Sequence, residues 1–193
     1  AYEIPEASKM SRGTHIKSLL SINANEEITI IERIRDFSDE EYLFMATANG
    51  IVKKTPTSEF RNAKARGMTA VRLDDGDRLV STVRSTGSFE IMLITRRGQA
   101  LRITEENVRS MGRSSRGVKG MNLASGDELC SAIPVIENCC MLVVTENGVG
   151  KRVDFDEFTA HGRGTGGQKI FGNIDAKGEI IGALTIKEDD NII

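Results

Sequence analysis

Short apolar runs alternate with polar turns along the chain, and the arrangement returns about every fifty residues. Three apolar runs of strand length each end at a glycine-containing turn: residues 42–47 before Gly50, 89–95 before Gly98, and 140–145 before Gly148. Gly and Asn tolerate the positive φ that a tight hairpin turn needs, so a run, a turn and a second run are typical of a β-hairpin. The pattern therefore predicts three hairpins, with the three glycines in equivalent tight turns.

Two further marks repeat behind each hairpin. The first ends in a glycine that we expect at an equivalent loop exit: Gly67, Gly117 and Gly167, with an earlier copy at Gly13. The second ends in Leu or Ile at positions 28, 79, 129 and 180, in steps of 51, 50 and 51. Strands are expected beside these marks, for example at 68–73 and 79–83. Four strands in about fifty residues, without a long helical period, match a propeller blade.

A short acidic and apolar segment also follows each hairpin, at residues 58–60, 106–108 and 156–158. We expect its apolar side chain to plug the core.

The repeats predict an all-β, propeller-like fold in one partial domain, residues 1–193. The expected units are a half blade at 1–38, blades at 42–88 and 89–139, and a nearly complete blade at 140–193 that includes the start of a next strand. Because the repeats begin and end inside a unit, we expect an incomplete ring and a chain that is part of a longer protein.

Composition narrows the class of protein. The chain has 193 residues, 5% aromatic residues and no Trp, so small and β-branched side chains must fill most of the core. No apolar run has the length of a membrane span and no signal peptide opens the chain, which favours a cytoplasmic protein. Three cysteines, Cys130, Cys139 and Cys140, lack zinc-site spacing and are expected to be buried thiols. With only two histidines, we expect no metal site and no cofactor.

Charge is distributed unevenly. The formal net charge is −2, yet residues 53–119 hold 15 Lys and Arg against 7 Asp and Glu, a local +8. The flanks are acidic, with 5 against 9 in residues 1–41 and 6 against 10 in residues 134–193. Basic charge concentrated on one stretch indicates a polyanion partner, because local charge rather than total charge attracts it.

Basic residues at repeat-equivalent places of this stretch form the candidate DNA-facing set. The set is Lys53, Lys54, Arg61, Lys64, Arg66, Arg96, Arg97, Arg102, Arg113, Arg116 and Lys119. Glycine loops flanked by Arg suit phosphate oxygens, since they offer exposed backbone N–H groups beside a guanidinium. A ring of such loops would give a basic rim that holds bent duplex with little reading of bases.

Enzyme chemistry finds little support in the sequence. Residues 162–167 fit G-x-G-x-x-G, but the strand and helix that a dinucleotide site needs are not predicted around them. No G-x-x-x-x-G-K-[ST] loop is present, and no nucleophile has a base near it. We therefore expect no catalytic residue in this chain.

The marks together resemble one family, the C-terminal domain of the A subunit of bacterial DNA gyrase. The strings that carry the resemblance are MATANGIVKKT at 45–55, VRSMGRSSRGVKG at 108–120, ENGVGKR at 146–152, and the opening YEIPEA at 2–7 followed by SRG at 11–13. The resemblance covers essentially the whole chain. The C-terminal domain of the topoisomerase IV A-type subunit is similar as well and is the alternative.

The resemblance implies a β-pinwheel, a propeller-like ring whose blades exchange strands, that binds double-stranded DNA around its rim and wraps it. It also implies a parent enzyme, an ATP-hydrolysing type II topoisomerase, that adds negative supercoils with a B subunit, which binds the ATP, and a second A subunit. Strand cleavage in that family belongs to a tyrosine outside this region. The family's Gln-Arg-Arg-Gly-Gly-Lys-Gly box is not in this sequence; residues 96–99 and 163–169 are the nearest strings.

A second class remains open from the residues alone. Propeller-like rings also serve as protein-interaction platforms. In that case the acidic flanks would bind a protein partner and the basic middle would be ordinary surface. Steep weakening of duplex binding by salt would favour the DNA interpretation.

Overall fold

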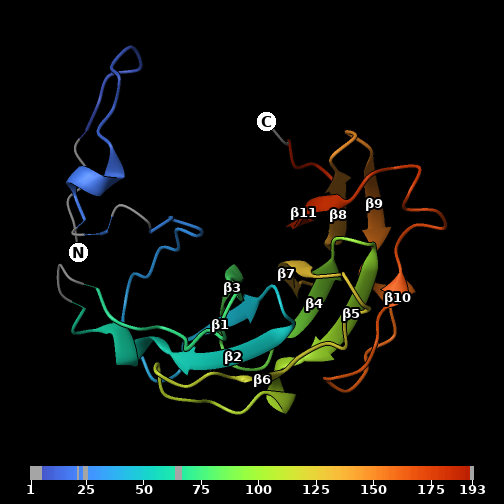
Figure 1. Cartoon of the computed structure of the whole chain (residues 1–193), viewed down its shortest axis with the longest axis horizontal. Coiled ribbons are helices and arrows are strands. Elements are labelled where there is room, and N and C mark those ends of the chain that lie inside the picture. The colour runs from blue at the N-terminus through green and yellow to red at the C-terminus, as the bar shows by residue number, and fades with distance from the viewer. Residues whose placement is uncertain (1–5, 21, 24–25, 64–66, 192–193) are drawn as a thin grey trace.

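The computed structural model describes residues 6–20, 22–23, 26–63 and 67–191. It is built of three antiparallel sheets that follow one another along an arc (Figure 1). The orders are β3-β1-β2-β6, β10-β5-β4-β7 and β11-β8-β9. The hairpin strands are β1 (Tyr42–Thr47), β2 (Ile51–Pro56), β4 (Glu90–Thr95), β5 (Gln99–Thr104), β8 (Cys140–Thr145) and β9 (Gly150–Asp154). The other strands are β3 (Leu79–Ser85), β6 (Val118–Lys119), β7 (Leu129–Val135), β10 (Gln168–Lys169) and β11 (Ile180–Ile186). The all-β, propeller-like fold expected from the repeat is thus confirmed.

The three hairpin turns are equivalent, as predicted. Gly50, Gly98 and Gly148 have φ of 77°, 80° and 77°. In each turn the hydroxyl of a buried threonine accepts the backbone N–H of the residue four positions later, for example Ile51 N to Thr47 Oγ1 at 3.3 Å. Gln99 and Val149 make the corresponding bonds at 3.1 and 3.2 Å. The repeated Thr and Gly therefore specify one turn three times.

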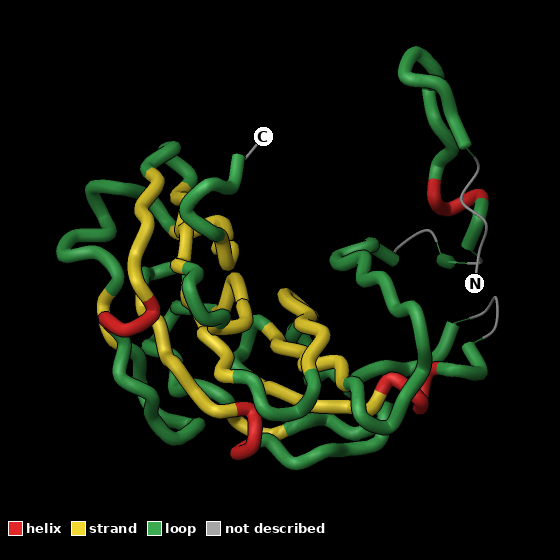
Figure 2. The backbone as a smooth tube through the Cα atoms, turned by 180° about the vertical axis from the view of Figure 1, so that it is seen from behind, coloured by secondary structure: helices red, strands yellow, loops and turns green. Residues whose placement is uncertain are grey.

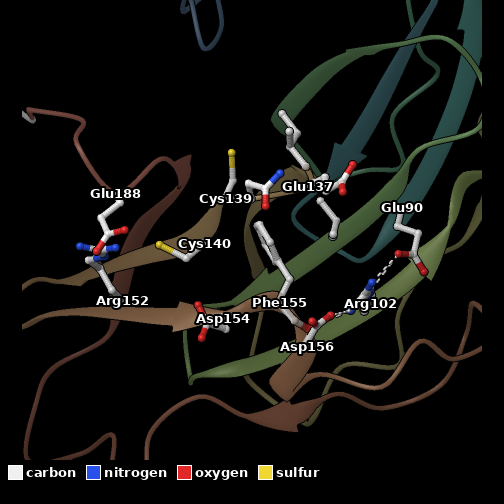
Figure 3. A pocket seen from close by; sticks show the side chains of 13 residues that line it. Glu90, Arg102, Glu137, Cys139, Cys140, Arg152, Asp154, Phe155, Asp156 and Glu188 are labelled. Atoms are coloured by element: carbon white, nitrogen blue, oxygen red, sulfur yellow. Dashed lines mark hydrogen bonds and ion pairs between the residues drawn. The ribbon is translucent and has the colours of Figure 1, made fainter.

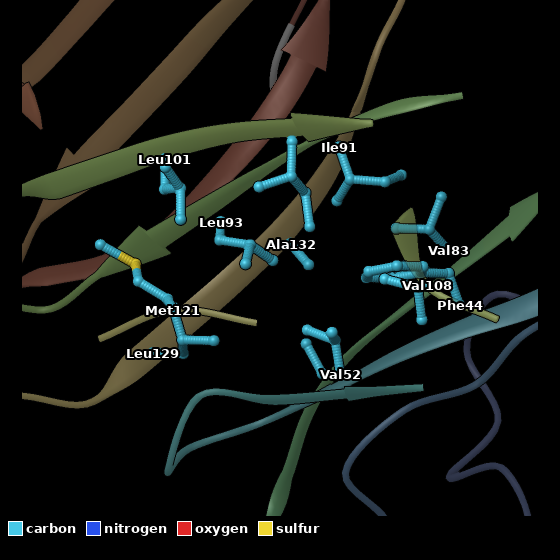
Figure 4. Close-up of a cluster of buried hydrophobic side chains, with 12 residues drawn as sticks. Phe44, Val52, Val83, Ile91, Leu93, Leu101, Val108, Met121, Leu129 and Ala132 are labelled. Carbon is cyan, nitrogen blue, oxygen red and sulfur yellow. The ribbon is translucent and has the colours of Figure 1, made fainter. Parts of the chain in front are cut away.

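The hydrophobic core lies between neighbouring sheets. Strand β4 is apolar on both faces because each face packs against a different sheet. Ile91 and Leu93 point into the cluster shared with the first sheet, where they meet Phe44 and Val52 (Figure 4). Met92 and Ile94 belong to a second cluster shared with the third sheet. Strands buried on both faces read as continuous apolar runs, which explains the pattern in the sequence.

Short 3-10 turns follow the hairpins at the positions of the acidic and apolar segments. They are η2 (Thr57–Phe60), η3 (Glu105–Asn107) and η4 (Phe155–Glu157), and a further turn, η1 (Ile16–Ser18), lies near the N-terminus. Val108 and Phe158 are buried and plug the core as expected, whereas Phe60 is half-buried.

Two expected strand regions differ from the prediction. Residues 67–73 form no strand, although the equivalent residues 118–119 and 168–169 pair with the hairpin of the preceding repeat. A strand needs a partner, and no hairpin of a preceding repeat lies among the described residues. In the described part of residues 1–38 there is likewise no strand.

The arc has an inner and an outer side (Figure 2). Strands β3, β7 and β11 line a shallow hollow on the inner side, together with Arg33 and Arg35. In the first two sheets the edge strand farthest from the inner side is β6 or β10, which therefore lies on the outer side. The outer side is therefore made of strands that come from the next repeat.

Candidate nucleic-acid interface

The outer edge of the first two sheets is covered by segments exchanged from the following repeat. Val118 and Lys119 pair with β2, and Gln168 and Lys169 pair with β5. Beyond each short strand the chain continues along the hairpin turn, where Gly120 N donates to Gly50 O and Ile170 N to Gly98 O, both at 2.8 Å. This strand exchange is the arrangement that the family resemblance implies.

Successive exchanged segments also contact each other. Asn122 N donates to Thr165 O at 2.8 Å, and Arg72 N donates to Ser115 O at 3.1 Å, which is the same contact one repeat earlier. Residues 67–72, 109–122 and 159–170 thus form one continuous ribbon, here named the outer belt.

Glycines allow the belt to lie against the sheets. A Cβ on Gly117 would come within 2.6 Å of Val52 O, and one on Gly167 within 2.7 Å of Ala100 O. Gly117 also has a φ of 105°. Gly67, at the equivalent place, has a φ of 71° and nothing within 4 Å of its Cβ position. Gly117 and Gly167 are thus equivalent, as predicted, in lying close to the neighbouring strand. Gly67 does not share this close approach.

Three residues of the predicted DNA-facing set lie on the belt. Lys119 is exposed, while Arg113 and Arg116 are half-buried. The Arg116 guanidinium is bound to the Asp74 carboxylate, with Nε 2.7 Å from Oδ1. Among the described residues, no acidic side chain lies within ion-pair distance of Arg113 or Lys119.

The belt carries further exposed basic residues that the candidate set omitted. They are Arg72, Arg109, Arg163 and Lys169. Arg163 and Lys169 stand fifty residues after Arg113 and Lys119, so the repeat itself could have identified them. Arg163 donates to Asn107 O and Lys119 O, at 3.1 and 3.2 Å, and joins two exchanged segments.

The structure contradicts the prediction that Lys53 and Lys54 face DNA, because both side chains are buried, with relative exposures of 1% and 7%. Lys53 Nζ donates to Ala70 O and Arg113 O, and burial lowers its pKa to about 8. Lys54 Nζ donates to Gly87 O and Glu105 O, at 3.0 and 3.2 Å. Their ammonium groups hold segments of the fold together and are not available to a phosphate.

Four other candidates lie off the belt or outside the described residues. Lys64 and Arg66 fall outside the described residues. Arg61 is exposed and donates to Phe37 O at 2.7 Å, and Arg97 donates to Ser125 O at 3.4 Å.

Arg96 belongs to a ladder of ion pairs that crosses all three sheets. Glu128 lies 2.8 Å from both Arg78 and Arg96, and Arg96 lies 3.5 Å from Glu179. The hydrogen bond from Arg78 lowers the pKa of the Glu128 carboxyl, which keeps it charged at neutral pH. These arginines are therefore neutralised by the protein itself.

Arg102 lines a cavity of about 700 Å³ between the second and third sheets (Figure 3). It forms ion pairs with Glu90 at 2.6 Å and with Asp156 at 3.4 Å. The hydrogen bond to Glu90 raises its pKa. Arg102 also donates to Phe155 O at 3.0 Å, so it ties one repeat to the 3-10 turn of the next.

Other chemistry is sparse in the described part of the chain. The three cysteines are free thiols, and burial raises the pKa of Cys130 to about 12, which keeps this thiol protonated at neutral pH. No cluster of His, Cys, Asp or Glu suited to a metal ion occurs among the described residues. Nor does any described helix reach the length and apolarity needed to cross a membrane. No helix follows Gly167 in the described chain, where a dinucleotide site would need one.

An arc of antiparallel sheets with exchanged outer strands and a basic outer belt defines a propeller-like domain of the β-pinwheel type. The chain belongs to the family described as "DNA gyrase C-terminal domain, beta-propeller", which it matches at residues 1–35, 41–85, 90–136 and 141–187. The short gaps in this match follow the repeat boundaries.

Relatives agree with this assignment. The DNA gyrase A subunit of Treponema pallidum (strain Nichols) is 65% identical over 98% of this chain. The DNA gyrase A subunit of Salmonella typhimurium is 44% identical over 59% of this chain. The chain spans only 23% and 13% of these two proteins.

Two solved structures share the fold closely. The C-terminal domain of DNA topoisomerase IV matches with a TM-score of 0.84 and 30% identity, covering 91% of this chain and 55% of that one. A DNA gyrase A C-terminal domain matches with a TM-score of 0.82 and 28% identity, covering 93% and 60%.

Proposed function

We propose that this chain binds double-stranded DNA along the outer belt and helps to wrap it for a DNA gyrase. Belt cations that recur one repeat apart carry the proposal: Arg113 with Arg163, and Lys119 with Lys169. They stand on backbone that glycines hold close to the sheets. Such an array suits a curved phosphate backbone and reads little sequence.

Gyrase is favoured over topoisomerase IV by the relatives, since the Treponema pallidum gyrase protein matches 98% of this chain at 65% identity. We infer that the whole protein works in the cytoplasm with an ATP-binding B subunit and with a second A subunit. Those contacts, DNA cleavage and ATP hydrolysis are assigned to other parts of the enzyme, and we expect no cofactor in this chain.

A charge-removal variant tests the proposal. Replacing Arg113, Arg116 and Lys119 by Gln should weaken binding of unrelated duplexes to a similar degree. Each lost phosphate contact should flatten the slope of log K against log salt by about 0.9. Fluorescence anisotropy at salt concentrations of roughly 50–200 mM measures both quantities.

The matched control removes three charges elsewhere. Arg33 and Arg35 on the inner side and the exposed Lys187 are replaced by Gln. This variant should keep nearly the full salt slope. Unchanged binding of the belt variant, or a loss confined to one duplex sequence, would refute binding along the belt.

A further inference from the structure

The pairing of Arg116 with Asp74 is the one ion pair made by the outer belt among the described residues. Arg116 Nε lies 2.7 and 2.8 Å from the two Asp74 oxygens, and Nη2 donates to Oδ2 as well. Asp74 stands in the turn before β3, where its carbonyl accepts Asp77 N at 3.0 Å. The next repeat has Ala124 and Gly166 at these two positions, so the contact is specific to one place on the belt.

The geometry of this pair is that of an anion held by an arginine fork. A guanidinium presents parallel N–H donors that fit a carboxylate and a phosphate in the same way. The hydrogen bond from Arg116 lowers the pKa of the Asp74 carboxyl, so both groups are charged at neutral pH.

A competing anion can reach the pair. The two side chains are 40% and 42% exposed, and exposed ion pairs are weak because water and salt screen them. Arg113 and Lys119 lie within three residues along the belt, so a duplex held by them would bring phosphates near Arg116.

We propose that the Arg116 guanidinium is a phosphodiester-binding site of the belt, which the Asp74 carboxylate occupies in the free protein. DNA must displace that carboxylate before it gains the contact, so Asp74 sets the affinity of the belt. The inference rests on the proposed function and deepens it.

Two neighbouring acids give a matched test. Asp74→Asn removes the carboxylate charge but keeps the size and an acceptor oxygen of the side chain. Asp75→Asn removes the same charge one residue away, from an exposed side chain that makes no ion pair among the described residues. Duplex affinity of the full chain is measured by anisotropy from roughly 50 to 200 mM salt.

Asp74→Asn should tighten binding more than Asp75→Asn and steepen the salt slope by about 0.9, the value of one phosphate contact. The ratio of the duplex affinity of Asp74→Asn to that of Asp75→Asn should therefore be about 3.5-fold larger at about 50 mM than at about 200 mM salt. Arg116→Gln should cost more affinity in the Asp74→Asn protein than in the unmodified chain, where the guanidinium is occupied.

If the two Asn variants bind DNA equally well, or if Asp74→Asn binds more weakly, this inference is overturned. The proposed function still stands in that case, provided that the unmodified chain shows salt-sensitive binding. Absence of salt-sensitive binding by the unmodified chain overturns both. Asp74→Ser removes the charge with a smaller side chain and repeats the test if the Asn variant loses its β-sheet circular dichroism.

Discussion

Lys53 and Lys54, which the sequence placed in the candidate DNA-facing set, are buried. Their ammonium groups donate to backbone carbonyls of neighbouring segments. Lys53 occupies the place that Leu101 fills in the next repeat, and both are 1% exposed. In the third repeat Lys151 Nζ donates to Ile170 O at 2.9 Å, the counterpart of the bond from Lys53 to Ala70 O. The position of Lys53, Leu101 and Lys151 therefore accepts either an apolar side chain or a lysine whose ammonium group donates to a backbone carbonyl.

The lowered pKa of Lys53 predicts a pH dependence of stability. Burial favours the neutral amine, so the folded state releases its proton near pH 8 while the unfolded state keeps it up to about 10.5. Between these values the unfolded state binds more protons, and the free energy of unfolding should rise with pH. Urea unfolding of the unmodified chain and of Lys53→Met, from about pH 7.5 to about pH 10.5, measures this contribution. A difference between the two proteins that stays constant over this range would contradict the assignment.

Burial is also one reason why only part of the candidate set lies on the belt. Repetition located Arg113, Arg116 and Lys119 on the belt, but it could not tell an exposed lysine from one covered by an exchanged strand. Lys54 would stand on an edge strand if the following repeat did not cover it. The ion pairs of Arg96 with Glu179 and of Arg102 with Asp156 join different repeats, and nothing in the hydrophobic pattern indicates them.

At the scale of elements, the close approach of the belt to the sheets makes its glycines testable. Gly167 does not have a positive φ, so its requirement is steric: a Cβ would lie 2.7 Å from Ala100 O. Gly167→Ala should push β10 from β5 and destabilise the fold by about 1–3 kcal/mol, as overpacking does. Denaturant unfolding measures the loss, and faster hydrogen exchange at the Ile170 amide should locate it.

Gly166 supplies the control, because it has no atom within 4 Å of its Cβ position and no positive φ. Gly166→Ala should leave stability within about 0.5 kcal/mol or raise it slightly. Similar losses for both alanine variants would show that the chain conformation, and not contact with β5, requires glycine at residue 167.

The strands themselves were largely predictable because each one has a local signature. Alternating turns and apolar runs located β1, β4, β8 and β3 within a residue or two at their starts. The short strands β6 and β10 have no such signature: two residues pair only because a glycine lets them approach another repeat. The family resemblance implied the exchange, whereas the hydrophobic pattern did not. Residues 68–73 had the pattern but form no strand.

For the whole molecule, the ion-pair ladder adds charged contacts between sheets that also meet through apolar clusters and hydrogen bonds. Glu128 binds Arg78 of the preceding repeat and Arg96 of its own repeat, so Glu128→Gln removes two ion pairs, one of them between repeats. We expect a loss of about 1 kcal/mol in the free energy of unfolding at low salt and a smaller loss at about 1 M salt. The lowered pKa of Glu128 also predicts that this contribution is present above about pH 4.5 and declines as pH falls through the lower, folded value.

Thermal unfolding at low and high salt checks the ladder, with Glu137→Gln as the control. Glu137 is exposed and forms no ion pair with a described residue. If both variants lose the same stability at both salt concentrations, general charge accounts for the effect and the ladder does not.

The arc as a whole predicts what this chain does to DNA topology. A bend of roughly 40–90° over about 20–30 base pairs costs on the order of 1–6 kcal/mol, which belt contacts must offset. The described belt covers two sheet edges and is partly neutralised at Arg116, so it should hold DNA without completing a wrap. We expect salt-sensitive, sequence-tolerant binding and little change in the linking number of a plasmid relaxed by a topoisomerase in the presence of this chain alone.

Agarose gels of the deproteinised plasmid measure the linking number, and the belt variant at Arg113, Arg116 and Lys119 serves as the control. A large shift with the unmodified chain, absent with the belt variant, would mean that this arc wraps DNA without the Gln-Arg-Arg-Gly-Gly-Lys-Gly box, because no such box is present in its sequence.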